Sequence, residues 1–108
     1  MNLAGARILI TGGAGGIGSA IAAEFLAAGA SVMLADMNEA GLAAAVARLG
    51  VPGRVTTAVA NLTDAAGRTS LCEQAAAWGV NVLVNNAGVN HFGMYDELTA
   101  AQVAQTVS

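Results

Sequence analysis

Short apolar runs and alanine-rich segments alternate along this chain of 108 residues, and no other feature constrains its fold as strongly. The apolar runs are nearly continuous, which is typical of strands that are buried on both faces of a sheet. The segments between them have helical length. The sequence predicts strands at Arg7–Thr11, Ser31–Asp36, Arg54–Ala60 and Val80–Asn85, and helices at about Gly16–Ala28, Glu39–Leu49 and Asp64–Trp78.

Glycines mark the ends of the predicted helices. Gly29, Gly50 and Gly79 each follow one of them, at the position where a left-handed residue commonly ends a helix. A fourth helix is expected to begin at Thr99, because Thr99 and Gln102 have the spacing of a capping box.

The order of the predicted elements determines how the strands run. Strands that are separated by helices run parallel and are joined by right-handed crossovers. We therefore expect an α/β fold: a Rossmann-type doubly wound parallel sheet of four strands with flanking helices, in one domain over residues 1–108.

The charge of the chain argues against several kinds of partner. It has seven acidic residues, four arginines and no lysine, for a net charge of −3. Such a chain has no basic stripe for nucleic acid and no polybasic patch for an anionic membrane.

Its richest apolar stretch, Phe25–Ala35, is shorter than the roughly 18 residues that a membrane span needs. Met1–Gly13 lacks the order of a signal peptide, so we expect a cytoplasmic protein that binds neither nucleic acid nor membrane.

Cys72 is the only cysteine of the chain and His91 is the only histidine. A CxxC site is therefore impossible within the chain, and a zinc site would need carboxylates that are scattered along it. We expect no metal site. Cys72 is predicted to be a small core residue, and Trp78 to pack on one helix face with Leu71 and Ala75.

The glycine-rich segment Thr11–Gly18 joins the first predicted strand to the first predicted helix. Glycines allow a tight turn and a close backbone approach, because they tolerate positive φ and lack a Cβ. The exposed N–H groups of the first helical turn, with the helix dipole, would form an anion site suited to a pyrophosphate. Ile17 is expected to point back into the core and anchor the turn. The alternative is that the glycines only let the helix pack closely on the strand.

Asp36 ends the second predicted strand, 18 residues after Gly18. In a βαβ unit, an acid near this spacing accepts hydrogen bonds from the ribose hydroxyls of an adenine dinucleotide. Its carboxylate would repel a 2′-phosphate, and neither Gly15 nor Met37 offers a basic side chain for one, so we infer NAD rather than NADP. The alternative is that Asp36 only belongs to the N-cap region of the next helix, although Asn38 can serve as that cap.

Two motifs resemble those of the short-chain dehydrogenase/reductase family. The spacing Gly12-xxx-Gly16-x-Gly18 is similar to the family's TGxxxGxG motif, and Asn85-Asn86-Ala87-Gly88 is similar to its NNAG motif. The resemblance implies a cofactor turn, residues around the adenosine, and residues near the nicotinamide-side ribose, with Asn85 bracing the sheet. The implied NAD-binding residues are Gly12, Ala14, Gly15, Gly16, Ile17 and Gly18 in the turn, Asp36 and Met37 at the adenosine, Asn61 and Leu62 at the adenine, and Asn86, Ala87 and Gly88 near the second ribose.

The same resemblance implies an NAD(H)-dependent oxidoreductase and a homo-oligomer. Such an enzyme transfers a hydride between nicotinamide and a small-molecule carbonyl/alcohol substrate. Family members run to about 250 residues, and their catalytic Ser, Tyr-xxx-Lys pair and Asn come after the point where this sequence ends. Tyr95 has no lysine four residues on. We therefore expect a truncated, cofactor-binding part without catalytic residues, which has little activity alone. The alternatives are a non-catalytic NAD-binding or regulatory module and an interaction domain that has lost its ligand.

Overall fold

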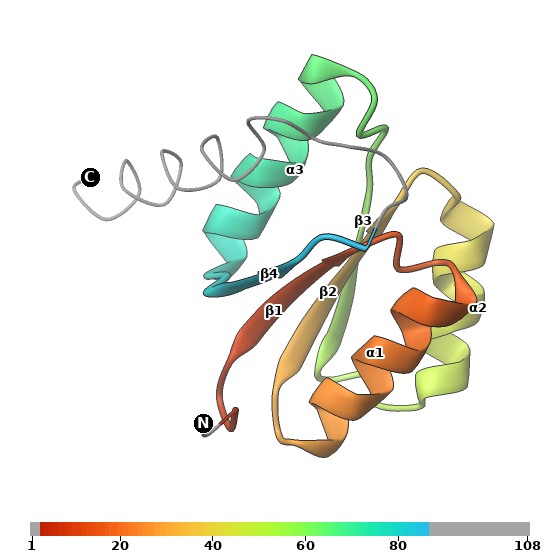
Figure 1. Cartoon of the computed structure of the whole chain (residues 1–108), viewed down its shortest axis with the longest axis vertical. Helices are drawn as coiled ribbons and strands as arrows, with labels where there is room; N and C mark the ends of the chain where they lie inside the picture. The colour runs from red at the N-terminus through yellow and green to blue at the C-terminus, as the bar shows by residue number, and fades with distance from the viewer. Residues whose placement is uncertain (1–2, 87–108) are drawn as a thin grey trace.

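A computed structural model describes residues 3–86 and shows strands and helices in strict alternation (Figure 1). The predicted order is confirmed, and most boundaries agree within one or two residues. The fourth strand is shorter than predicted, because its hydrogen-bonded pairing with the first strand covers only three residues. The elements are β1 (Arg7–Thr11), α1 (Gly16–Ala27), β2 (Ser31–Asp36), α2 (Glu39–Leu49), β3 (Val55–Val59), α3 (Ala65–Trp78) and β4 (Val82–Val84).

The four strands form one parallel sheet in the order β3-β2-β1-β4. The chain builds outward from β1 to β3 and then returns to the other side of β1. The strand order therefore reverses between β1 and β4. In open α/β sheets, a crevice for ligands lies at such a reversal, beyond the carboxyl ends of the strands. We call the end of the sheet at Thr11, Asp36, Val59 and Val84 the carboxyl edge, and the opposite end the amino edge.

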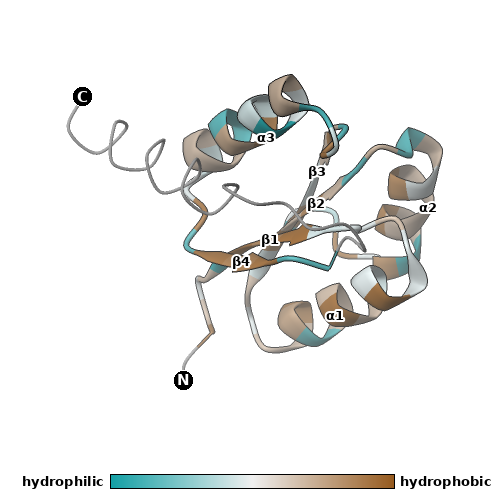
Figure 2. Ribbon diagram, turned by 45° about the horizontal axis from the view of Figure 1, so that its top comes forward, coloured by the Kyte–Doolittle hydropathy of each residue, from teal (hydrophilic) through white to brown (hydrophobic). Residues whose placement is uncertain are grey.

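Helices cover both faces of the sheet, as expected for a doubly wound fold (Figure 1). Side chains alternate along β1: Ile8 and Ile10 belong to the core beneath α1 and α2, whereas Leu9 belongs to the core beneath α3. Cys72 is buried in the α3 core, and Trp78 packs against it, as predicted. The hydrophobic colouring in Figure 2 is accordingly strong along β1 and β4.

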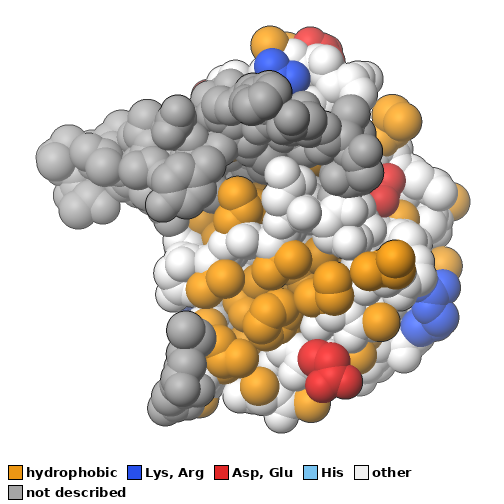
Figure 3. Space-filling view, viewed as in Figure 1, with side chains coloured by type: hydrophobic (Ala, Val, Ile, Leu, Met, Phe, Trp, Pro, Cys, Tyr) orange, Lys and Arg blue, Asp and Glu red, His pale blue; other side chains and the backbone are white. Residues whose placement is uncertain are grey.

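The prediction that the strands are buried on both faces is confirmed for β1 and β2 and is wrong for the outer strands, β3 and β4. β3 and β4 have only one neighbouring strand each in the described part of the chain, and their side chains are mostly half-buried or exposed. Apolar side chains gather on the surface between α1 and β4 in Figure 3. Among the partly buried apolar residues packed against the core beneath α1 and α2, Ile21 and Phe25 come from α1, and Val82 and Val84 come from β4.

The helix ends follow the predicted chemistry. Gly29, Gly50 and Gly79 have φ values of 95°, 67° and 91°, so each adopts the left-handed conformation that favours glycine. The predicted helix from Thr99 lies outside the described residues. None of the helices in residues 3–86 is long and apolar enough to cross a membrane.

Candidate functional site

The carboxyl edge brings together the two glycine- and asparagine-containing segments that the sequence singles out. The fully buried Thr11 links them: its Oγ1 donates to Asn85 Oδ1 at 3.0 Å and accepts from the Asn86 backbone N–H at 2.9 Å. The bracing role expected for Asn85 fits this contact. Asn86 also lies beside the first turn of α1, because a Cβ built on Gly18 would be 3.1 Å from Asn86 Nδ2.

The glycine turn is folded tightly onto itself. Gly12 has a φ of 69°, and its carbonyl oxygen accepts the Gly15 N–H at 3.2 Å. A Cβ on Gly18 would lie 2.4 Å from the same Gly12 oxygen, a distance that no real Cβ atom tolerates. By contrast, no atom of the described residues lies within 4 Å of a Cβ built on Gly16. Gly18 is thus required by the fold of the turn, whereas Gly16 faces open space.

The amino end of α1 leaves backbone donors without partners. Gly15 is its N-cap and supplies no side-chain hydrogen bond, and the first turn holds no acidic residue. The first intrahelical bond runs from Ser19 N–H to Gly15 O at 3.0 Å. The N–H groups of Gly16, Ile17 and Gly18 therefore have no acceptor among the described residues. Three free donors at the positive end of a helix dipole form a site for an anion.

The prediction that Ile17 anchors the turn in the core is wrong. Its side chain is 72% exposed. The packing role belongs instead to Gly13, which is buried so tightly that a Cβ on it would lie 2.7 Å from Leu34 Cβ. The close approach of the turn to β2 leaves no room for a larger anchor, and Ile17 projects from the first helical turn at the carboxyl edge.

Asp36 lies at the end of β2 with its carboxylate turned toward the glycine turn. Oδ2 accepts the Ala14 N–H at 3.1 Å, and Oδ1 accepts the Asn38 N–H at 3.0 Å. The side chain of Asn38, not that of Asp36, caps α2 by accepting the Gly41 N–H at 3.0 Å. A carboxylate has about four acceptor positions, so the half-exposed Asp36 keeps acceptor capacity for a hydroxyl ligand.

Asn61 and Leu62 follow β3 and have different environments. Asn61 is exposed, and its Oδ1 accepts from the backbone and side chain of Thr63 at 3.0 and 2.6 Å. Leu62 is only 7% exposed and packs in the α3 core, so only its backbone is available to a ligand. Gly67 positions this segment: a Cβ there would lie 2.0 Å from the Asn61 carbonyl oxygen. This role of Gly67 was not predicted, although a glycine inside a predicted helix commonly indicates a close contact.

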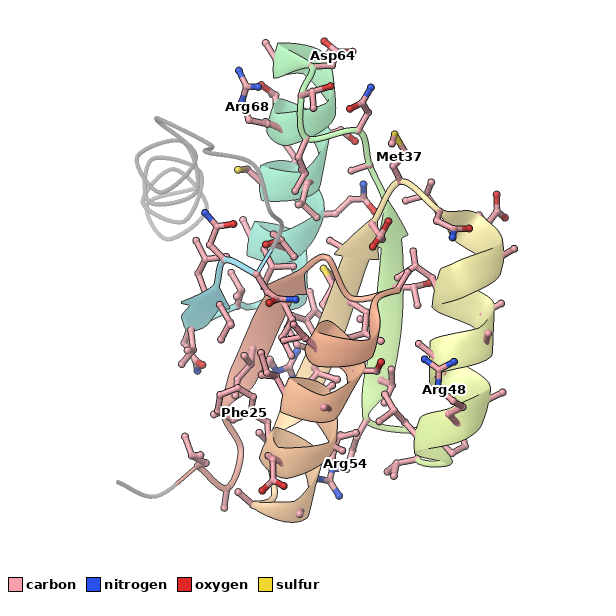
Figure 4. All side chains as sticks on the ribbon, turned by 45° about the vertical axis from the view of Figure 1, so that its right-hand side comes forward. Phe25, Met37, Arg48, Arg54, Asp64 and Arg68 are labelled. Atoms are coloured by element: carbon pink, nitrogen blue, oxygen red, sulfur yellow. The ribbon has the colours of Figure 1, made fainter. Side chains whose placement is uncertain are left out.

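Three large apolar side chains are strongly exposed in the described part of the chain, and all three lie at the carboxyl edge. Ile17 is the second residue of α1, Met37 follows β2, and Val59 ends β3; their exposures are 72%, 66% and 51%. Figure 4 shows Met37 just beyond the end of β2. Val59 was not predicted; the structure places it opposite Asp36 in the parallel register of β2 and β3. Exposed apolar groups beside an anion site suit a ligand that has both phosphates and flat rings.

Several residues considered for function from the sequence lie outside the described residues. They include Ala87 and Gly88 of the second motif, together with His91 and Tyr95. Within residues 3–86, no group of three or more His, Cys, Asp or Glu side chains is arranged to hold a metal ion.

Comparison with known proteins agrees with this geometry. A family model described as short chain dehydrogenase matches residues 6–108. "Short chain dehydrogenase/reductase dpmpG" of Macrophomina phaseolina is 47% identical over 92 residues, which cover 82% of this chain and 53% of that protein. "3beta-hydroxysteroid dehydrogenase 2" of Eggerthella lenta is 42% identical over 91 residues, 81% of this chain and 35% of that protein. The chain thus spans about half or less of the length of these relatives.

Solved structures show the same fold. A short-chain dehydrogenase/reductase from Brucella melitensis has a TM-score of 0.78 and 26% identity, covering 96% of this chain and 53% of its own. A hydroxysteroid dehydrogenase from Escherichia coli has a TM-score of 0.79 and 25% identity, with the same coverages. The matching family model, the relatives and the shared sheet lead to one conclusion: this chain belongs to the short-chain dehydrogenase/reductase family.

Proposed function

We propose that this chain is the NAD(H)-binding part of a short-chain dehydrogenase/reductase that transfers a hydride between nicotinamide and a small carbonyl or alcohol substrate. The observation that carries the proposal is the uncapped start of α1, with three free N–H groups beside the carboxylate of Asp36. Family membership supports a nucleotide cofactor, and the geometry of the carboxyl edge supports its placement there.

The residues at the carboxyl edge fit the parts of a dinucleotide. The N–H groups of Gly16, Ile17 and Gly18 would hold the pyrophosphate, and Gly12, Ala14 and Gly15 would shape the turn around it. Asp36 would accept hydrogen bonds from the adenosine ribose.

The remaining predicted residues would surround the two ends of the cofactor. We propose that Met37 and the unpredicted Val59 lie against the adenine, with Asn61 and the Leu62 backbone nearby. Asn86, held by Thr11, would lie near the nicotinamide-side ribose. Ala87 and Gly88, which follow Asn86, are proposed for the same ribose on the basis of their motif alone.

We further propose a preference for NAD over NADP. A 2′-phosphate on the adenosine ribose would meet the negative charge of Asp36, which is held in place by two backbone N–H groups. The neighbouring Met37 carries no charge, and α2 begins with an acidic residue, Glu39. Like charges at close range disfavour binding.

The chemistry that the bound cofactor supplies is the acceptance or donation of a hydride. The chain's own residues would bind and orient it, but the chain contains no lysine and therefore no Tyr-xxx-Lys pair. We propose that the 108-residue chain binds the cofactor without appreciable turnover.

The test is a titration of the chain with NADH and NADPH, followed by cofactor fluorescence. We expect saturable NADH binding and weaker NADPH binding. Gly16→Val should weaken NADH binding strongly because its side chain enters the open space above the turn. Gly53→Val is the matched control, since its Cβ also meets no described atom but lies at the other end of the sheet. Absence of NADH binding at millimolar concentration, or equal affinities of the two variants, would overturn the proposal.

Self-association and a cytoplasmic location remain predictions. β4 has no strand on its outer side in the described part of the chain, and such an edge favours association. Size-exclusion chromatography with light scattering tests this point: a monomer at all concentrations would contradict it.

A further inference from the structure

We propose that a second, separate site at the amino edge of the sheet binds a phosphate group. A hollow of about 140 Å³ lies there, far from the glycine turn. We call it the arginine hollow; Arg7, Ser31, Gly53, Arg54, Val55, Thr56 and Trp78 line it. Figure 4 shows Arg54 and Met37 at opposite ends of the sheet.

Arg7 is held at one side of the hollow by the end of α3. Its Nη1 donates to the Trp78 carbonyl oxygen, and its guanidinium carbon lies 5.7 Å from the centre of the Trp78 ring. This stacking and the hydrogen bond fix the plane of the guanidinium. Only one of its five N–H groups is used within the described residues, so the others can serve a ligand.

Arg54 is held at another side by the end of α1. Its Nε and Nη2 donate to the Ala30 carbonyl oxygen at 3.1 and 2.8 Å, and Nη2 also donates to the Leu26 carbonyl oxygen. These contacts fix the side chain and leave Nη1 with no partner among the described residues. Both arginines are therefore rigidly placed before a ligand arrives, which reduces the entropy lost on binding.

The charge around the hollow is unbalanced. None of its lining residues is acidic, and neither Arg7 nor Arg54 pairs with a carboxylate within residues 3–86. Two of the four arginines of a chain with net charge −3 are thus gathered at one hollow without a counter-charge from the described residues. The hydroxyl groups of Ser31 and Thr56 add two neutral donors.

This donor set matches a phosphate group better than other small anions. Arg7 can present its free Nε and Nη2 donors as a pair to tetrahedral oxygens, Arg54 adds the N–H groups of Nη1, and hydroxyl groups can complete the shell. The volume admits one phosphate but is too small for a nucleotide. The shared ligand chemistry is a phosphate dianion, either free or at the end of a small phosphomonoester.

The position of Trp78 allows a direct test. It is the only tryptophan of the chain and lines the hollow, so its fluorescence reports on this site and not on the glycine turn. The chain is titrated with inorganic phosphate at constant ionic strength, and in parallel with glycerol phosphate and with acetate. We expect a saturable change of emission in about the millimolar range for the phosphates and a weaker response to acetate. Tighter binding of inorganic phosphate would indicate free phosphate as the ligand, and tighter binding of glycerol phosphate would indicate a phosphomonoester.

Variants identify the donors. Arg7→Gln should weaken phosphate binding at least about tenfold, whereas Arg48→Gln, the charge-matched control on α2, should leave it within about twofold. Thr56→Val, which preserves side-chain shape on an outer strand, should weaken it about threefold and decides the question if Arg7→Gln does not fold. Equal responses to phosphate and to acetate, equal affinities of the two arginine variants, or an unchanged affinity of Thr56→Val would overturn the proposal.

Discussion

The three helices within residues 3–86 begin at the same edge of one sheet, yet they begin in two different ways. At α2, Asn38 accepts the Gly41 N–H at 3.0 Å, and at α3, Asp64 accepts the Ala66 N–H at 3.1 Å. At α1, Gly15 occupies the cap position and offers no side chain. At α2 and α3 the side chain of the cap residue thus accepts an N–H group of the first turn, whereas no side chain does so at α1.

This difference separates stability from binding. A side-chain cap contributes about 1 kcal/mol to the stability of a helix, and α1 does without that contribution. What it gains is an exposed positive end beside Thr11 and Asp36, at the place where the strand order reverses. A cap at α2 or α3 should thus affect folding alone, and a change at the start of α1 should affect cofactor binding.

The largest effect is expected from Gly18→Ala, which breaks the geometry of the α1 start. Its Cβ would lie 2.4 Å from the Gly12 oxygen, so the turn must move. We expect the free energy of unfolding to fall by about 1–3 kcal/mol. NADH affinity should fall about a hundredfold, because displacements near 1 Å misalign the N–H donors. Chemical denaturation and NADH titration measure the two effects. Gly53→Ala serves as the control, and a Gly18→Ala protein with normal affinity would contradict the geometry described.

Gly15→Asp would make α1 resemble the other two helices. The backbone of Gly15 is extended, with φ −78° and ψ 164°, so an aspartate cap fits without strain. We expect stability to rise by a few tenths of a kcal/mol and NADH affinity to fall about thirtyfold, because the new carboxylate occupies the anion site.

Gly15→Asn separates the charge from the cap in this experiment. It adds a cap without a negative charge, and its NADH affinity should lie between those of the parent and Gly15→Asp. If all three proteins bind NADH equally, the start of α1 is not the pyrophosphate site. The Trp78 response to phosphate should be the same in all of them, because the arginine hollow lies at the opposite edge.

Asp36→Asn tests the second component of the site. It removes the charge that would discriminate against a 2′-phosphate and weakens an acceptor of ribose hydroxyls. We expect about tenfold weaker NADH binding and a smaller difference between NADH and NADPH. Glu24→Gln removes a charge from an exposed position near the end of α1, away from the carboxyl edge, and is the matched control. An unchanged ratio of NADH to NADPH affinity in Asp36→Asn would contradict the assignment.

The smallest effect on binding is expected from Asp64→Ala, which removes a true cap. The Ala66 N–H loses its acceptor, so thermal or chemical denaturation should show a loss of about 1 kcal/mol. NADH affinity should stay within about twofold. A loss of affinity as large as that of Asp36→Asn would show that the contrast between the helix starts is not the basis of binding.

Much of this arrangement could be predicted from the sequence because its signals are local. The alternation of apolar runs and helical segments predicted seven elements in order, and three glycines predicted the helix ends. Asn38 was also correctly predicted to be able to cap α2, and the Asp36 carboxylate lies beside the glycine turn instead of capping that helix. Each of these signals depends on residues close to one another in the chain.

The features that could not be predicted depend on contacts between distant segments. Ile17 follows a run of glycines, so no apolar periodicity exists to show which way it faces. The half-burial of β3 and β4 depends on which strands lie beside them, and the sequence pattern does not contain that information. The arginine hollow joins Arg7 and Trp78, which are 71 residues apart, and no motif marks either.

The uncapped start of α1 has a consequence for the lifetime of the folded protein. A ligand that binds only the native state raises its stability by about 2.7 kcal/mol at a hundredfold excess over the dissociation constant. With its first turn completed by a metabolite instead of a side chain, the protein should melt at a higher temperature and resist proteolysis better when that metabolite is abundant. The amount of the protein would then rise and fall with the supply of the cofactor.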